Sequence, residues 1–131
     1  MRLVRVRREF CIGCGLCRVQ CEAHHAGGED VAKVLKHRSA PALGGIRIER
    51  RDTECMSVRC QHCVNAPCID ACLTGAMHRD AATGLVLVQD DKCVGCGTCM
   101  VVCPFGAIRK DPVSGKAVKC DLCMDRIDKG L

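Results

Sequence analysis

The feature that most constrains this chain is a run of four closely spaced cysteines, Cys93, Cys96, Cys99 and Cys103. Gaps of two, two and three residues, followed by Pro104, are typical of a ligand run for a [4Fe–4S] cubane. Three thiolates at this spacing can reach three corners of the cube, because Gly95 and Gly97 let the loop curl. Cys103 lies about one helical turn past Cys99 and is expected to face away from that cluster, so we expect it to serve a second cluster. One run therefore predicts a partner run.

Three further cysteine runs are present. The first has the same spacing and consists of Cys11, Cys14, Cys17 and Cys21. The second has a middle gap of four residues, stiffened by Pro67, and it consists of Cys60, Cys63, Cys68 and Cys72. The last is cut short and contains Cys120 and Cys123. Each complete run offers three thiols and a displaced fourth, which is the pattern expected of paired clusters.

Segments 75–88 and 106–119 repeat each other at an offset of 31 residues, which is also the offset between Cys72 and Cys103. Each segment predicts a strand, an Asp-to-Gly turn and a second strand, so each is expected to form a β-hairpin. Repetition at this scale indicates a duplicated unit, with one hairpin packed behind each of two clusters.

Composition bears on what the cysteines do. The chain has 131 residues, 15 cysteines and only 2 aromatic side chains, Phe10 and Phe105. An ordinary apolar core would be thin, so we expect the cysteines to supply stability as disulfides or as metal ligands. Disulfides fit poorly, because the count is odd, no signal peptide is evident and the thiols form tight runs. Zinc also uses Cys-x-x-Cys pairs, but it has no use for a third and fourth thiol in one run.

Charge and hydropathy argue against other classes of protein. The formal charge is +5, but an oxidised cubane with four thiolates carries about −2, so three or four clusters would bring it to about −1 or −3. We therefore interpret the basic residues as counter-charge and docking surface, with no nucleic-acid role, since base stacking would need more aromatics. No apolar run is long enough to predict a membrane span. Arg7 and Arg8 are followed by Cys11, not by the apolar segment of an export signal, so we expect a cytoplasmic protein.

The segments between the runs are less informative. Residues 3–7 and 46–50 alternate apolar and polar side chains and predict strands. Within the insertion 22–45, Asp30 is expected to cap a short helix that continues to Arg38, with one face formed by Val31, Val34 and Leu35. We expect this insertion to carry a surface for a partner.

Four side chains near the runs have open interpretations. His24 and His25 are candidates for ligands or proton relays, although solvated loop groups are the commoner case. Cys55 falls outside the spacing of the runs and is interpreted as a buried free thiol, with ligation as the alternative. His62 lies between two cysteines, so it either hydrogen-bonds a cluster sulfide and raises the cluster potential or faces solvent.

These motifs resemble those of the four-cluster ferredoxin-like electron-transfer subunits. That family includes the iron–sulfur subunits of dimethyl sulfoxide reductase, formate dehydrogenase and hydrogenase complexes, carbon monoxide dehydrogenase partners, and subunits beside tungsten aldehyde oxidoreductases. The resemblance covers nearly the whole chain and rests on the cysteine runs, on the Cys103-Pro104 pair, and on segment 119–126, Lys-Cys-Asp-Leu-Cys-Met-Asp-Arg, with Gly130. It implies an α+β fold of two fused bacterial 2[4Fe–4S] ferredoxin-like lobes, with short hairpins and short helices around the clusters. Residues 1–52 with 116–131 would form the outer lobe, and residues 53–115 the inner lobe.

The same resemblance implies that the second run pairs with the third and the first with the fourth. One cluster would be held by Cys60, Cys63, Cys68 and Cys103, and another by Cys72, Cys93, Cys96 and Cys99. A third would use Cys11, Cys14 and Cys17, and a fourth would use Cys21, Cys120 and Cys123, so each of these two lacks one ligand.

Four clusters need sixteen thiolates, and the runs supply fourteen, enough for three complete sites. Family members continue past the position of Gly130 with a proline and two further cysteines. We therefore expect four clusters and a natural protein that extends beyond Leu131. The alternative is a short chain with three clusters, the outer one completed by Cys120 or Cys123.

The site chemistry predicts electron transfer without catalysis. A cubane capped by four thiolates leaves no corner for a substrate, and the sequence assembles no nucleophile, base and oxyanion site. The resemblance implies a wire subunit that passes single electrons to or from a catalytic partner of molybdenum or tungsten enzyme, hydrogenase or carbon monoxide dehydrogenase type. A diffusible polyferredoxin is the alternative, and a zinc-held interaction module is a third class. Size and the 22–45 insertion favour the wire subunit, because a carrier needs only one lobe.

Overall fold

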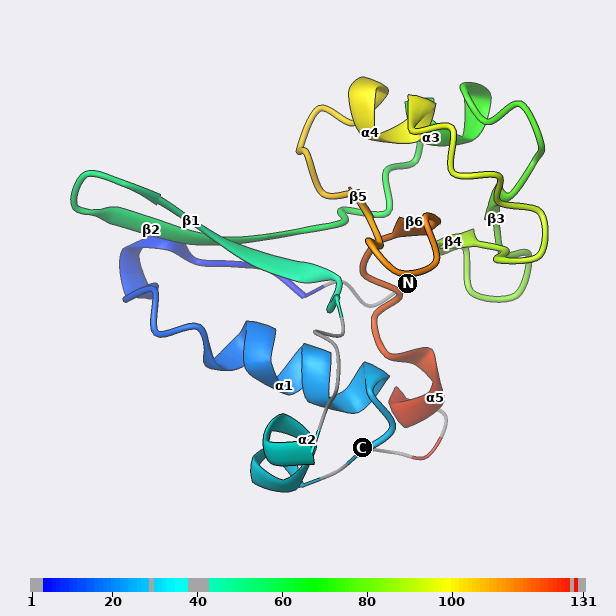
Figure 1. Cartoon of the computed structure of the whole chain (residues 1–131). Coiled ribbons are helices and arrows are strands. Elements are labelled where there is room, and N and C mark those ends of the chain that lie inside the picture. The colour runs from blue at the N-terminus through cyan, green and yellow to red at the C-terminus, as the bar shows by residue number, and fades with distance from the viewer. Residues whose placement is uncertain (1–3, 29, 38–42, 128, 130–131) are drawn as a thin grey trace.

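The computed structural model describes residues 4–28, 30–37, 43–127 and 129, which form short helices and two-stranded antiparallel sheets (Figure 1). In chain order the elements are the 3-10 helix η1 (Arg8–Phe10), α1 (Leu16–His25), α2 (Val31–His37), β1 (Ile46–Arg51), β2 (Glu54–Arg59), α3 (Pro67–Asp70), β3 (Met77–Arg79), β4 (Val86–Val88), α4 (Thr98–Val102), β5 (Arg109–Lys110), β6 (Ala117–Val118) and α5 (Met124–Ile127). The predicted mixture of short helices and hairpins is confirmed. The division into two fused lobes stays a prediction, and its boundary after residue 52 falls in the turn between β1 and β2.

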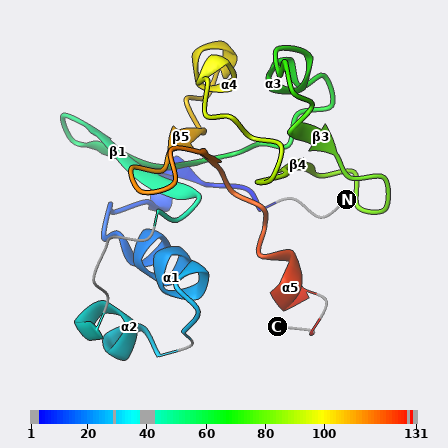
Figure 2. The ribbon, with the colours of Figure 1, turned by 45° about the vertical axis from the view of Figure 1, so that its right-hand side comes forward.

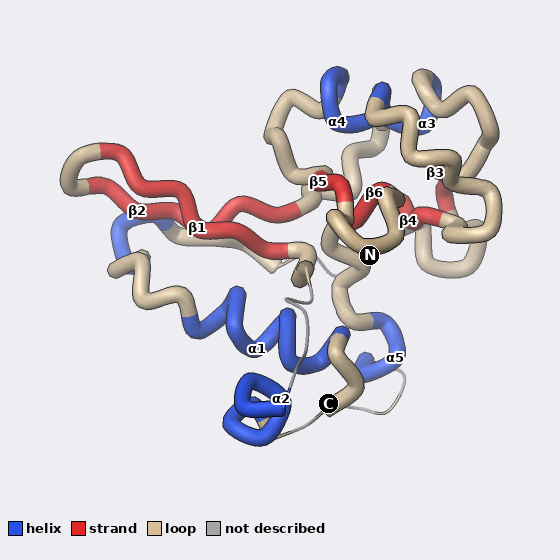
Figure 3. Tube along the Cα trace, viewed as in Figure 1, coloured by secondary structure: helices blue, strands red, loops and turns tan. Residues whose placement is uncertain are grey.

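The two repeated segments form the predicted hairpins, β3–β4 and β5–β6 (Figure 3). Their turns use the same hydrogen bonds. In the first, the Asp80 carboxylate accepts bonds from the N–H and the hydroxyl of Thr83 at 2.8 and 2.5 Å. In the second, Asp111 accepts the same two bonds from Ser114 at 2.9 and 2.6 Å. Equal turn chemistry at equal spacing supports the duplicated unit inferred from the sequence.

The N-terminal half differs in part from the prediction. The strand expected over residues 3–7 is wrong for its described part, because the backbone from Val4 to Arg7 is irregular and Val4 is 61% exposed. A strand needs a hydrogen-bonded neighbour, and the sheet of β1 and β2 contains only those two strands. The Asp30 cap is confirmed, since its Oδ1 accepts bonds from the N–H groups of Ala32 and Lys33 at 3.1 and 3.2 Å. The expected end of that helix at residue 38 lies outside the described residues.

The arrangement of the elements brings the second and third cysteine runs together. Helices α3 and α4 lie side by side at one end of the molecule, beyond the hairpins β3–β4 and β5–β6, in both Figure 1 and Figure 2. Helices α1, α2 and α5 lie toward the other end, and β1 packs against α1. Because α3 carries Cys68 and α4 carries Cys99, their pairing places thiols of two runs near one another.

The buried apolar residues form two small groups. One group consists of Ala66, Cys68, Met77, Val86, Cys99 and Ile108. The other, which we call the junction group, consists of Val58, Cys60, Ala107 and Cys120. Four of these ten residues are cysteines, so whatever the sulfur atoms bind forms part of the core.

A basic side chain at the same position of each repeated hairpin holds the cysteine loop that precedes it. The guanidinium of Arg79 donates to the backbone oxygens of Cys63 and Val64, each at 2.7 Å, and to its own hairpin turn. Its counterpart 31 residues later, Lys110, donates only to the oxygen of Gly95, at 3.0 Å. Arg79 therefore holds the enlarged loop of the second run with two hydrogen bonds, whereas Lys110 holds the loop of the third run with one.

This difference predicts unequal effects of two matched substitutions. We expect Arg79→Met to lower the free energy of unfolding by about 1 kcal/mol, because charge-assisted hydrogen bonds to three backbone oxygens are lost from an exposed side chain. Lys110→Met removes one such bond and should have a smaller effect. Urea unfolding followed by circular dichroism measures both, and a larger drop for Lys110→Met would contradict this account of the loop.

Candidate iron–sulfur sites

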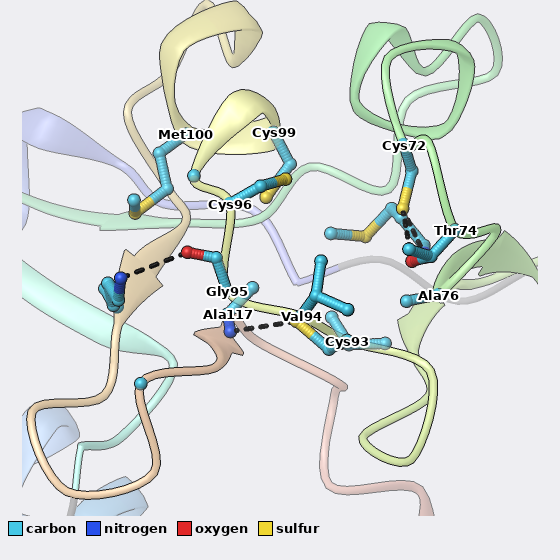
Figure 4. Close-up of a pocket in the computed structure, with 15 residues that line it drawn as sticks. Cys72, Thr74, Ala76, Cys93, Val94, Gly95, Cys96, Cys99, Met100 and Ala117 are labelled. Carbon is cyan, nitrogen blue, oxygen red and sulfur yellow. Dashed lines mark hydrogen bonds between the residues drawn. The ribbon is translucent and has the colours of Figure 1, made fainter.

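Four cysteines line a small cavity between the second and third runs. We call it the Cys93 site, and its cysteines are Cys72, Cys93, Cys96 and Cys99. Gly97, with φ +83°, turns the loop into α4 and so directs Cys99 into the interior. Figure 4 shows Cys72 entering from the side opposite Cys96 and Cys99. The rest of the wall is mainly apolar and includes Val88, Met100 and Ala117.

A second small cavity lies between the same two runs. We call it the Cys60 site, and its cysteines are Cys60, Cys63, Cys68 and Cys103. Helix α4 ends at Val102, so Cys103 has extended backbone and crosses to the run before it. The structure therefore brings together both quartets that the family resemblance implies, each with one cysteine from the other run. Their role as ligands stays a prediction.

Backbone N–H groups point at the sulfur atoms of both sites. The Sγ of Cys72 accepts a bond from the N–H of Met77 at 3.3 Å, and the Sγ of Cys60 accepts one from His62 at 3.4 Å. Cys93 and Cys103 each accept one at 3.5 Å, from Ala117 and Ala107. Such bonds favour the ionised form of sulfur, which is the form that binds metal.

Crowding of the sulfur atoms opposes ionisation unless a cation lies among them. Burial raises the pKa of the Cys68 thiol, and the nearby sulfurs of Cys60 and Cys103 raise it further. Burial also raises the pKa of Cys99, with the sulfurs of its own run adding to the effect. Four thiolates at such close quarters are stable only around a positively charged centre. Four soft sulfur donors, apolar walls and N–H donors behind the sulfurs therefore fit a [4Fe–4S] cluster in each cavity.

Cysteines from the two ends of the chain meet at a third place, which we call the Cys120 site: Cys21, Cys120 and Cys123. The backbone N–H of Gly45 donates to the Sγ of Cys21 at 3.3 Å. A Cβ atom on Gly45 would lie 2.4 Å from the Cα of Cys120, so only glycine lets the chain pass here. Burial raises the pKa of Cys123 to about 11, and nearby Asp121, Cys21 and Cys120 add to the effect.

The prediction that His24 and His25 lie in a loop is wrong, although His25 is exposed to solvent. Both lie in the last turn of α1, and each is paired with an acid near the C-terminus. His24 Nε2 is 3.0 Å from Asp125, and His25 Nε2 is 3.5 Å from Asp121. Hydrogen bonds that the His25 ring donates to Asp121, and then to Cys21, raise the pKa of His25 to about 10. The side-chain donor atoms of His25, Asp121 and Cys123 all lie within 4.8 Å of one another, beside the Cys120 site.

The first run is the most open of the four. Cys14 and Cys17 are exposed and Cys11 is half-buried; we call these three the Cys11 site. The loop between them rests on the β1–β2 hairpin, where Arg50 donates to the oxygen of Gly13 at 2.5 Å. A Cβ atom on Gly13 would lie 2.7 Å from the Sγ of Cys55. Cys55 is thus half-buried and packed on this loop, and both of its interpretations, a free thiol or a ligand, stay predictions.

Three buried side chains beside the sites are Arg59, His62 and Lys119. The solvent-facing interpretation of His62 is wrong, since the ring is 1% exposed and its Nδ1 accepts the N–H of Val86 at 3.1 Å. Burial lowers the pKa of His62 to about 4, and the charges of Lys119 and Arg59 lower it further. Sequence reasoning missed Arg59 and Lys119, although each directly precedes the first cysteine of a run.

Comparisons with known proteins identify the family to which this chain belongs. Residues 51–131 match the family model of a 4Fe-4S dicluster domain. Protein NrfC of Escherichia coli (strain K12) is 42% identical over 116 residues, which are 87% of this chain and 50% of that protein. The thiosulfate reductase electron transfer subunit PhsB of Salmonella typhi is 37% identical over 88% of this chain and 58% of its own length. The chain thus spans about half the length of these relatives.

Another relative is matched over most of both chains. The electron transport protein HydN of Escherichia coli (strain K12) is 34% identical over 90% of this chain and 73% of its own length. The family model alone covers more than half of the chain. The sulfur-lined cavities and these matches together show that the chain belongs to the 4Fe-4S dicluster family of ferredoxin-like proteins and binds [4Fe–4S] clusters.

Proposed function

We propose that this chain is an electron-transfer subunit of an oxidoreductase complex, and that a partner subunit carries out the catalysis. A bound [4Fe–4S] cluster supplies one-electron redox chemistry. The names of PhsB, a thiosulfate reductase electron transfer subunit, and of HydN, an electron transport protein, support this role. The partner type that we propose is a molybdenum or tungsten enzyme, a hydrogenase or a carbon monoxide dehydrogenase.

The observation that carries the proposal is that four cysteines converge on each of the Cys60 and Cys93 sites. With every corner taken by a thiolate, no position is left for a substrate, so these sites exchange electrons and do not transform a bound molecule. The apolar walls shield buried thiols such as Cys68 and Cys99 from water, and the backbone N–H groups of Met77 and Ala117 donate to the sulfurs of Cys72 and Cys93. These contacts set the reduction potential and protect the site.

Exposed apolar side chains next to the ligand loops support a partner surface. Ile12 lies between Cys11 and Cys14 and is exposed, and Val94 and Val64 are exposed beside the Cys93 and Cys60 sites. A partner that covers one of these side chains lies close to the neighbouring cluster. Electron transfer between the two proteins requires such a short distance. Apolar side chains at the rim of a redox site are typical of docking surfaces.

We propose that the cysteines gathered at each site are the ligands of its cluster. The Cys60 and Cys93 sites each use their four cysteines. The Cys11 site and the Cys120 site each supply three, so four clusters need two further ligands.

We also propose two ferredoxin-like lobes, an outer one of residues 1–52 with 116–131 and an inner one of 53–115. In the part of the chain that the structure describes, no helix has the length and hydropathy to cross a membrane. The cytoplasmic location stays a prediction.

Metal content gives the first test. We expect the protein, purified without oxygen, to be brown, with a broad absorbance at about 400 nm. It should contain iron and sulfide in equal amounts. Chelation or oxygen should bleach and unfold it, because metal binding supplies folding energy in so small a core. A colourless, folded preparation that contains zinc would contradict the assignment. About twelve or about sixteen irons per chain would distinguish three clusters from four.

The crossing of ligands gives the second test. We expect Cys103→Ser to perturb the cluster of the Cys60 site, although Cys103 belongs in sequence to the run of the Cys93 site. Cys96→Ser should perturb the Cys93 site, and Cys55→Ser, outside both quartets, serves as the control. Electron paramagnetic resonance of the reduced protein distinguishes the sites. Damage confined to the Cys93 site in Cys103→Ser would show that the quartets are paired differently.

Assembly gives the third test. Gel filtration of a native extract should show the chain eluting with a much larger protein, because a wire subunit stays bound to its catalytic partner. Val94→Asp, which places a charge on a docking loop, should release part of the chain into a small peak, and Val113→Asp on an exposed hairpin turn should not. A single small peak for the unmodified chain would favour the diffusible polyferredoxin.

A further inference from the structure

Arg59, His62 and Lys119 are almost fully buried, with 4%, 1% and 7% of their surfaces exposed. Arg59 and Lys119 are basic side chains. A charge in a protein interior is normally paired with an opposite charge. Among the described residues, neither cation has a carboxylate partner within hydrogen-bonding or ion-pair distance.

Their contacts leave donors without acceptors. Arg59 donates one bond to the oxygen of Cys60 at 3.1 Å, while its Nε is buried with no partner. Lys119 donates to the oxygens of Cys120, at 2.9 Å, and of Val86. His62 Nδ1 accepts the N–H of Val86, so the proton of the neutral ring is on Nε2, which is also buried without a partner. Unpaired buried donors of this kind indicate an anionic or electron-rich neighbour.

All three side chains lie where the Cys60 site adjoins the Cys120 site. Arg59 directly precedes Cys60, and Lys119 directly precedes Cys120. Cys60 and Cys120 pack together in the junction group, with Cys103 and Leu122 against them. Val86 contacts two of the three side chains. Its N–H donates to His62 Nδ1, and its oxygen accepts a bond from Lys119.

Each cation acts on the site that belongs to the other run. Burial raises the pKa of Cys68 in the Cys60 site, and the charge of Lys119 opposes that rise. Burial raises the pKa of Cys120, and the charge of Arg59 opposes that rise. Each site therefore has a thiol near one of the two cations, Cys68 near Lys119 and Cys120 near Arg59.

The repeat shows that this arrangement is particular to one of the two inner sites. In the second hairpin, the N–H of Ala117 donates to the Sγ of Cys93. The equivalent N–H 31 residues earlier, that of Val86, donates to His62 instead. At the Cys93 site the neighbouring cation is Lys110, which is exposed to solvent. Water screens an exposed charge far more than a buried one.

We propose that Arg59 and Lys119, with the Nε2–H of His62, are the counter-charges of the junction between the Cys60 and Cys120 sites, and that they raise the reduction potential of the clusters bound there above that of the Cys93 site. The proposal rests on the electron-transfer function proposed above. Reduction adds one electron, makes or breaks no bond, and takes the cluster charge from about −2 to about −3. Buried cations therefore stabilise the reduced form more than the oxidised form.

The test is a redox titration of the whole chain loaded with iron and sulfide, with dithionite as reductant and electron paramagnetic resonance as readout. We expect Lys119→Met to shift the reduction equilibrium of a junction cluster at least tenfold toward the oxidised form, which is 59 mV for one electron. Arg59→Gln should shift it in the same direction. Lys119→Arg keeps the charge and should restore most of the potential. Lys33→Met, which removes a charge from the exposed face of α2, should leave all potentials unchanged.

The outcomes separate this proposal from the function on which it rests. Unmodified chain that holds no reducible cluster would overturn the proposed function itself. Reducible clusters whose potentials do not move in Lys119→Met and Arg59→Gln would overturn the counter-charge role alone. If both variants lose iron while Lys119→Arg keeps it, the loss supports the proposal, because the charge is then what retains the cluster. Loss of iron from Lys119→Arg as well would indicate a role in packing and overturn it.

Discussion

The rest of this structure depends on the gathering of four thiols into each of two small apolar cavities. Thiolates that are buried and close together repel one another, so the cavities are stable only when a positively charged centre balances them. The surrounding elements have little stability of their own. Helix α3 has 4 residues and α4 has 5, far below the length at which an isolated helix forms in water. The pairing of α3 with α4 therefore relies on what the sulfurs hold between them.

Much of the inner half could be predicted from the sequence because its determinants are local. The spacing of cysteines decides which corners of a cube a short loop can reach, and the Asp-to-Gly turns of the two hairpins need only neighbouring residues. The Asp30 cap followed from the same kind of local pattern, and the structure has it. The spacing indicated that the fourth cysteine of a run serves another cluster, and the resemblance implied which runs pair. The cavities place Cys72 and Cys103 where the resemblance has them.

What could not be predicted depends on contacts between distant segments. The alternating residues 4–7 form a strand only if another strand pairs with them through backbone hydrogen bonds. No strand in the described sheets does so. His24 and His25 meet their acids across about a hundred residues of sequence. Arg59 and Lys119 look like surface charges in a basic chain, and only the packing of Cys60 on Cys120 reveals that they are inside.

The exchange of Cys72 and Cys103 between runs also bears on how the protein is made. A ribosome releases the chain from its N-terminus onward. Under the proposed ligands, the Cys93 site has all its thiols only once Cys99 has emerged, and the Cys60 site only after Cys103. Eleven cysteines precede Cys99 in the sequence, so each growing chain carries eleven thiols before any quartet closes. Cluster insertion at the second run thus has to wait for translation of the third.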